Sequence, residues 1–165
     1  MSEDVVFASS AKSIDILMIF DTEYIKKMYP NPSQGQGFPT SIDRDCGFLL
    51  CTGSRGIISG QGSGDLSFRA NEGDKVSFMG TSMSDNSGDA VKVSRMGYLA
   101  GVNVFGHFLV NTINESGVEF TRFGATVRSR GNEEFYVQFA LYTRDGSTQK
   151  LFGYYYWSPS IAIAS

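Results

Sequence analysis

Catalytic chemistry in this chain would depend on a single histidine, His107. A Ser-His-Asp or Cys-His site needs a histidine as its general base, but the pattern VFGHFLV predicts a half-buried histidine within a strand, and no GxSxG motif is present. One histidine also excludes type 1 copper, which takes two. A zinc site built from Cys46, Cys51 and His107 matches no standard spacing. We therefore expect no catalytic residue, no metal centre and no cofactor.

Two acids, Asp21 and Glu23, directly follow a strongly apolar segment. Paired carboxylates can perform acid–base chemistry. Asp21 can equally cap a short helix that begins at Thr22, with Glu23 in its first turn, where the helix dipole favours negative charge. We favour the capping interpretation and keep the acid–base pair as the alternative.

The segment SDNSGD brings together Asp85, Asn86 and Asp89, whose side-chain oxygens suit calcium. The spacing and the terminal glutamate of an EF-hand are missing, so a simple turn is favoured over a weak cation site. GQGSGD (60–65) resembles one copy of a calcium repeat that works only in tandem. We interpret it as a loop.

Composition and net charge limit the classes of function that the sequence allows. The chain has 165 residues, 41% of them hydrophobic, with a formal net charge of −3 and a pI near 5.1. This charge excludes the electrostatic footprint of a nucleic-acid or anionic-membrane binder. No apolar run is long enough to span a bilayer, and residues 1–12 read as a flexible N-terminus without signal-peptide features. We expect a single cytoplasmic domain (1–165) whose two cysteines stay reduced.

Short strand patterns separated by turn signals run along the chain. Ile14 to Phe20 is nearly all apolar, as in a central strand. DLSFRA and DKVSFMG alternate, and NEGD between them predicts a hairpin turn at Gly73. RDGST predicts another hairpin. The pattern favours an all-β protein: an antiparallel β-sandwich of jelly-roll type with one short helical turn over Thr22 to Met28.

Four consecutive aromatic residues occur near the end of the sequence, in GYYYWSP. In a strand, Tyr155 and Trp157 share one face and Tyr154 and Tyr156 share the other, so that one pair belongs to the core. An exposed aromatic row would suit a sugar or a protein partner. We single out Tyr155 and Trp157 as the candidate ligand or interface residues.

Three ordered motifs resemble the PixA/AidA family of bacterial inclusion-body proteins. The first is IDILMIFDTEYIKKMYPNPSQ with the following P-T-x-I, the second is GDKVSFMGTSMS and the third is GYYYWSPSIAI; together they span Ile14 to Ile163. Ser158 stands where the family commonly has an aspartate before the proline. The resemblance marks these residues as the family-defining strand exit, with a structural role: Asp21, Thr22, Glu23, Tyr29, Pro30, Asn31, Pro32, Ser33 and Gln34.

The resemblance implies a β-sandwich without enzymatic activity, associated with intracellular inclusions, with stationary-phase or quorum-sensing expression and with host association. It leads to the hypothesis of a non-enzymatic, self-associating protein, at least a homodimer. The alternative is a lectin-like carbohydrate-binding module, calcium-assisted through the SDNSGD loop. An enzyme of cupin type is the weakest of the three, because the chain has one histidine.

Overall fold

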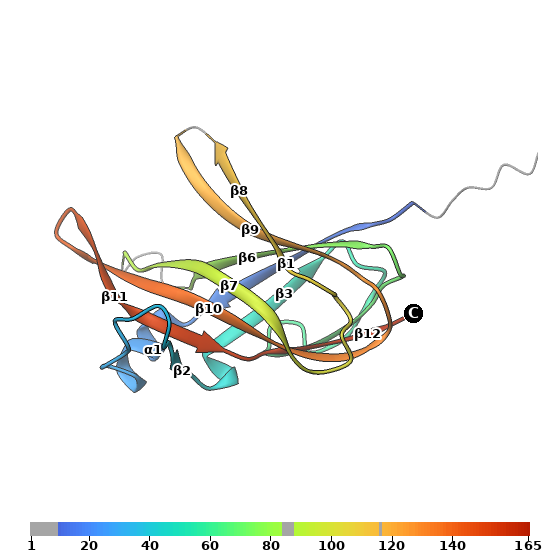
Figure 1. The fold of residues 1–165 in the computed structure, drawn as a ribbon, viewed down its shortest axis with the longest axis horizontal. Helices are drawn as coiled ribbons and strands as arrows, with labels where there is room; N and C mark the ends of the chain where they lie inside the picture. Colours follow the sequence, from blue (N-terminus) through green and yellow to red (C-terminus); the bar gives the residue numbers. More distant parts are fainter. Residues whose placement is uncertain (1–9, 84–87, 116) are drawn as a thin grey trace, which may run out of the picture.

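Two β-sheets packed face to face form most of the structure (Figure 1). The computed structural model describes residues 10–83, 88–115 and 117–165. None of the helices in these ranges has the length and hydropathy needed to cross a membrane. The elements are β1 (Ser13–Phe20), α1 (Thr22–Met28), β2 (Thr40–Ser41), η1 (Arg44–Cys46), β3 (Gly47–Thr52), β4 (Ile57–Ser59), β5 (Asp65–Arg69), β6 (Lys75–Ser82), β7 (Ala90–Gly101), β8 (Leu109–Glu115), β9 (Val118–Thr126), β10 (Gly131–Asp145), β11 (Thr148–Trp157) and β12 (Ser160–Ala164).

The predicted all-β sandwich with one short helix after the first strand is confirmed. One sheet has the order β3-β1-β6-β9-β8, and the other has the order β2-β11-β10-β12-β5-β4, with β7 on β10. Most neighbours pair antiparallel, as expected. Three pairs are parallel, β1 with β6, β11 with β2 and β12 with β5, so both sheets are mixed. Each parallel pair joins distant segments, which local turn signals could not reveal.

The segment between β5 and β6 does not form the hairpin that alternation suggested. Gly73 does adopt a positive φ of 94°. However, β5 pairs with β12 and β4 in one sheet, while β6 pairs with β1 and β9 in the other. The turn therefore crosses between the sheets. Alternation identified the inward faces, and it holds for both strands: Phe68 and Phe78 are fully buried, one from each sheet.

Aromatic side chains fill the space between the sheets in two groups. At one end, Phe20 packs against Phe139 with ring centroids 4.1 Å apart and meets Trp157 edge-on at 5.1 Å. At the other end, Phe78 and Phe135 pack with ring centroids 5.8 Å apart. Such tilted and edge-on contacts add to the free energy of burial. The described residues thus share one continuous core.

The N-terminal segment is pinned to the sandwich before β1 begins. Residues 1–9 of the predicted flexible segment lie outside the described residues. Lys12, by contrast, donates its backbone N–H to Asp74 at 2.9 Å and accepts from the backbone N–H of Lys75 at 2.8 Å. The expected flexible segment therefore does not include Lys12.

Candidate functional site

The strand exit after β1 is organised by its own hydrogen bonds. Asp21 caps α1, because its carboxylate accepts the backbone N–H of Tyr24 at 3.2 Å. Glu23 lies in the first helical turn. Thr22 is buried and shares a hydrogen bond of 2.8 Å with the Ser82 hydroxyl on β6. The predicted capping hydrogen bond of Asp21 is present, so this carboxylate is engaged with the helix.

The rest of the motif fastens a loop to β11. The backbone carbonyl of Tyr29 accepts a hydrogen bond from the Tyr155 hydroxyl at 2.9 Å. The side-chain hydroxyl of Tyr29 accepts a hydrogen bond from the backbone N–H of Asp43 at 3.1 Å. The Gln34 amide donates to the carbonyl of Phe152 at 2.7 Å. Each bond joins the loop to residues remote in sequence. These hydrogen bonds therefore fix the path of the loop after α1.

Within that loop the two prolines have different environments. Pro30 and Asn31 are exposed, whereas Pro32 is buried against Gly153, whose missing side chain leaves room for its ring. Ser33 forms an isolated antiparallel bridge to Tyr154. The strand-like contact explains why this polar segment has a defined conformation.

The expectation that Tyr155 and Trp157 form a ligand or interface surface is wrong. Both side chains are fully buried. The Trp157 indole N–H donates to the Arg44 carbonyl at 2.8 Å, and burial raises the pKa of the Tyr155 hydroxyl. The two faces were separated correctly, and the buried one is the face on which Trp157 meets Phe20 and Tyr155 stacks on Phe139.

Of the three residues of the candidate cation site, the structure describes Asp89. Asp85 and Asn86 lie outside the described residues. The carboxylate of Asp89 is buried and forms a salt bridge of 2.9 Å with the ammonium group of Lys26. Across the described residues no three His, Cys, Asp or Glu side chains gather in a metal-binding arrangement. Asp89 therefore links α1 to the strand that follows the SDNSGD segment.

The histidine side chain is exposed to solvent, whereas both cysteine side chains are buried. His107 is exposed in the loop before β8, so the expected half-buried strand position is wrong. Cys46 and Cys51 are buried, unbridged thiols. Burial raises the pKa of the Cys46 thiol to about 11 and raises that of Cys51 as well. A thiolate activated by an imidazole is therefore not available among these residues.

A buried ion pair that sequence analysis missed lies at the start of β6. The Asp74 carboxylate accepts from the Arg55 guanidinium and from the backbone N–H groups of Lys12 and Asn71. Its position in the GDKV motif was visible in the sequence. The burial of the carboxylate was not, because an aspartate after a turn glycine usually faces solvent.

The β8–β9 hairpin projects from the sandwich (Figure 1). β9 pairs with β6 only from Thr126 to Phe123, while its pairing with β8 continues to the hairpin tip. Beyond Phe123 the hairpin is a two-stranded ribbon. A ribbon of this kind is marginally stable alone in water, so contacts on its faces and edge contribute to its order.

The outer edge of β8 carries no protective feature. Within the described residues β8 pairs with β9 alone, and residues 109–114 contain no charge, proline or glycine. Leu109 and Val110 at its start are 70% and 63% exposed. Natural edge strands usually carry lysine, proline or a covering loop. β8 is thus an open edge with an apolar end.

The opposite edge of the same sheet shows the usual protection. The Gln61 side chain donates to the Cys51 carbonyl at 2.8 Å and accepts the Cys51 N–H at 2.9 Å. Leu49 bridges to Ser63 in the same loop. The loop between β4 and β5 therefore covers the outer edge of β3. The outer edge of β8, by contrast, pairs with no strand of the described residues.

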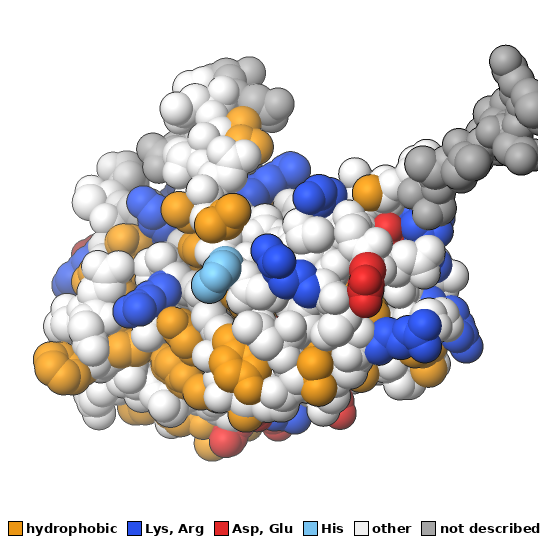
Figure 2. Space-filling view, turned by 45° about the vertical axis from the view of Figure 1, so that its right-hand side comes forward, with side chains coloured by type: hydrophobic (Ala, Val, Ile, Leu, Met, Phe, Trp, Pro, Cys, Tyr) orange, Lys and Arg blue, Asp and Glu red, His pale blue; other side chains and the backbone are white. Residues whose placement is uncertain are grey.

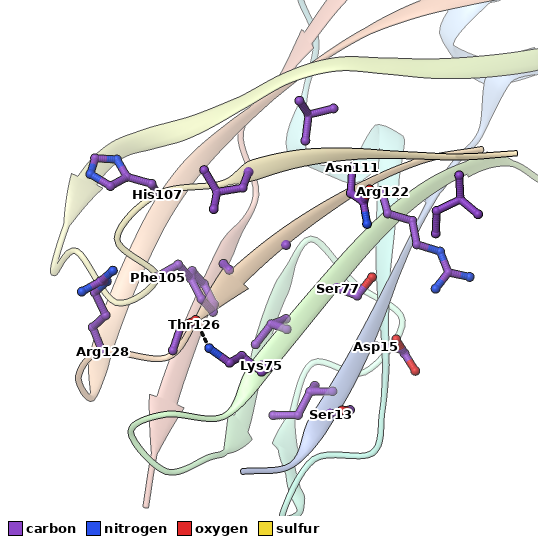
Figure 3. Close-up of a pocket in the computed structure, with 17 residues that line it drawn as sticks. Ser13, Asp15, Lys75, Ser77, Phe105, His107, Asn111, Arg122, Thr126 and Arg128 are labelled. Atoms are coloured by element: carbon purple, nitrogen blue, oxygen red, sulfur yellow. Dashed lines mark hydrogen bonds between the residues drawn. The ribbon is translucent and has the colours of Figure 1, made fainter. Parts of the chain in front are cut away.

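A groove of about 650 Å³ lies between the hairpin and the exposed face of β1 and β6 (Figure 3). His107 and Arg128 stand at one end and Arg122 at the other, with Lys75 between them. The Lys75 ammonium group donates to the Thr126 hydroxyl at 3.0 Å. Lys and Arg side chains also predominate over acids on the face that carries the histidine (Figure 2).

A smaller polar pocket of about 300 Å³ lies on the other sheet. Arg44 and Glu134 form an ion pair of 2.6 Å at its side, and the Ser160 hydroxyl is within hydrogen-bond distance of Asp65, at 2.6 Å. Next to Glu134 on β10, the outward-facing Tyr136 stacks on a tyrosine of β11 with ring centroids 5.3 Å apart. The pocket combines hydrogen-bonding groups with a nearby aromatic surface.

Comparison with known proteins agrees with the sequence motifs. The sequence model of the PixA family, described as inclusion body protein, matches residues 12–121 and 111–163. The crystal structure of an inclusion body protein from Burkholderia cenocepacia J2315 is 41% identical in sequence, with a TM-score of 0.85 over 96% of this chain and 99% of that chain. None of the curated proteins that were compared matches the chain. The match over most of its length shows that the chain belongs to the PixA family of inclusion body proteins.

Proposed function

We propose that this protein is a non-enzymatic, self-associating protein of the inclusion-body type, which assembles in the cytoplasm through the open edge of β8. The observation that carries the proposal is the edge itself: β8 lies at the end of its sheet on a projecting hairpin, its residues 109–114 carry no charge, and the other edge of the same sheet is covered. Two copies can pair antiparallel along such an edge and extend the sheet across a two-fold axis.

The side chains of β8 are compatible with antiparallel self-pairing. An antiparallel pair centred on Thr112 would place threonine opposite threonine and Val110 opposite Asn114, with no like charges in contact. The exposed side chains of Leu109 and Val110 would lose water contact in the assembly. A formal net charge of only −3 opposes association weakly. A dimer is the smallest assembly that this edge can make, and other exposed apolar residues would be needed for larger ones.

Sedimentation velocity over a wide concentration range tests the proposal. We expect concentration-dependent association of the unmodified protein. Thr112→Lys puts two ammonium groups opposite each other and should weaken association by about tenfold or more. Asn132→Lys is the matched control, because Asn132 is also exposed but lies on β10 where it pairs with Ala162 of β12 on one side and accepts the backbone N–H of Val102 on the other. A protein that stays monomeric at every concentration would contradict the proposal.

A carbohydrate-binding role is the second candidate, and we place it at the polar pocket beside Arg44 and Glu134. Sugar sites combine planar hydrogen-bonding groups with an aromatic surface, and the half-buried Tyr136 and Tyr156 stack lies beside Glu134. Trp157 has no part in it, since that side chain is in the core. A glycan array with and without calcium, repeated with Glu134→Gln, tests this role; an array without any hit would remove it.

The link to stationary-phase or quorum-sensing expression and to host association belongs to the same proposal. Its support is family membership alone. Protein abundance measured through growth of the native host would test the expression link.

A further inference from the structure

We propose that the groove beneath the β8–β9 hairpin binds an amphipathic organic anion, a carboxylate carried on an apolar chain. This inference concerns a small ligand, and Leu109 and Val110 of its groove also belong to the strand proposed for self-association. The groove of about 650 Å³ has the size of natural small-molecule sites. It exists because β9 leaves β6 at Phe123 and the hairpin diverges from the sheet.

The charges around the groove favour an anion. Lys75, Arg122 and Arg128 line it, against the single carboxylate of Asp15, so three cations less one anion leave +2 where the whole chain carries −3. Among the side chains that the structure describes, which leave out those of residues 115 and 118–120, none forms an ion pair with any of the three cations. The local charge is thus opposite in sign to that of the protein and attracts anions.

Arg122 has the geometry to hold a carboxylate. Its side chain lines the end of the groove opposite His107 and Arg128, and its guanidinium extends on the side where Asp15 lies (Figure 3). A guanidinium can bind both oxygens of a carboxylate at once. Lys75 uses one of its three N–H groups on Thr126, which leaves two for a ligand.

The apolar part of the ligand would lie along β8. Leu109, Val110 and Ile113 line the groove from the hairpin side. Where β9 still pairs with β6, Gly124 lines the groove without a side chain, and a Cβ placed there would meet only the Leu109 carbonyl oxygen, at 4.0 Å. Apolar walls, open space at this glycine and cations at the rim suit a chain with a charged head better than a fully hydroxylated sugar.

Titration calorimetry with dodecanoate, below its micelle concentration, tests the inference. We expect one binding site per chain. Arg122→Glu should weaken binding at least tenfold by removing the cation, and Gly124→Leu should do so by filling the groove without backbone strain. Arg95→Glu is the matched control, since Arg95 is an exposed arginine on β7 outside the groove and should leave binding unchanged.

Two further probes separate charge from hydrophobic contact. Dodecanol and dodecyltrimethylammonium carry the same chain with no charge or with the opposite charge, and both should bind at least tenfold more weakly than dodecanoate. Absence of dodecanoate binding, equal affinity for all three probes, or equal loss in Arg95→Glu would overturn the inference. Binding to phosphatidylglycerol vesicles without binding of monomeric dodecanoate would overturn it too, because the ligand would then be a membrane surface.

Discussion

Arg55 and Asp74 face each other in a two-point contact: Nε lies 2.9 Å from Oδ2 and Nη2 lies 2.9 Å from Oδ1. The side chain of Asp74 is almost completely buried, at 1% exposure. Two backbone N–H groups, from Lys12 and Asn71, complete its hydrogen bonds. The pair joins the N-terminal segment, the loop after β3 and the turn between the two sheets at one point.

Acid should destabilise the protein through this pair. The Arg55 guanidinium lowers the pKa of the Asp74 carboxyl to about 2, below its ordinary value of 3.8. Because the folded pKa is depressed, the stabilisation is complete above the unfolded pKa and is lost as pH falls from about 5 toward 2. We expect a loss of about 2 kcal/mol in the free energy of unfolding over that interval. Urea unfolding at successive pH values measures it.

The variant Asp74→Asn isolates that contribution. It should lower stability at pH 7 by at least the same amount and flatten the acid slope, because its amide carries no charge to titrate. Glu72→Gln, an exposed carboxylate two residues away, is the control and should change neither. An acid slope that persists unchanged in Asp74→Asn would assign the effect to other groups.

Trp157 should behave as a core residue. Trp157→Ala removes a fully buried ring that contacts Phe20 and also leaves the Arg44 carbonyl without its indole donor. We expect a loss of about 3–5 kcal/mol in the free energy of unfolding, measured by chemical denaturation. Tyr154→Ala, at a partly exposed position of the same strand, should cost clearly less. A loss below about 1 kcal/mol at Trp157 would contradict the assignment.

Gly47 lies against the indole ring of Trp157. A Cβ at this position would lie 2.7 Å from Cζ2 of Trp157. Gly47→Ala should therefore cost about 1–3 kcal/mol by overpacking. Combined with Trp157→Phe, whose smaller ring makes room, the cost of the alanine should fall, and a double-mutant cycle measures that coupling. Strict additivity would show that the two sites do not interact.

The two thiols should resist modification in the native protein. Cys46 and Cys51 are buried, and burial raises the pKa of the Cys46 thiol to about 11. At pH 8 few thiolates form, and reagent access requires opening of the fold. We expect an aromatic disulfide reagent to titrate both thiols after denaturation by guanidinium and neither of them quickly before it. Fast reaction of the folded protein would contradict the observed burial.

Asp21→Ala should lower stability by about 1 kcal/mol, the usual cost of losing an N-cap. The reason is the hydrogen bond to the Tyr24 N–H, which has no other partner in the first helical turn. Glu23→Gln should cost only a few tenths, since Glu23 acts through the helix dipole alone. Thermal unfolding followed by circular dichroism compares the two, and equal effects would argue against the cap.

Local patterns predicted the strands and their inward faces well. The apolar strand β1, the alternation of Leu66 and Phe68, and the Gly146 turn of the β10–β11 hairpin were all visible in the sequence. Pairing partners were not, since alternation gives the buried face of a strand without naming its neighbour. The same limit applied to Tyr155 and Trp157: periodicity separated two faces but did not identify the one that meets the core.

The candidate sites were harder to predict than the fold. The groove arises from the divergence of β9 from β6, and it is lined by residues that no sequence motif connects, such as Lys75 and Arg122. The bare edge of β8 could have been noticed as an uncharged run at residues 109–114. Recognising it as an edge requires the strand order, which depends on contacts between distant segments.

The position of β12 has a consequence for how the chain folds during synthesis. This last described strand lies between β10 and β5, and its Ser160 pairs with Asp65, 95 residues earlier. A ribosome must release the chain through Ala164 before that sheet can be completed. Until then β5 and β10 each present an unpaired edge to their surroundings. Folding dominated by such long-range pairing is slow, so the nascent protein would pass through a period in which strand exchange between neighbouring chains competes with closure of its own sandwich.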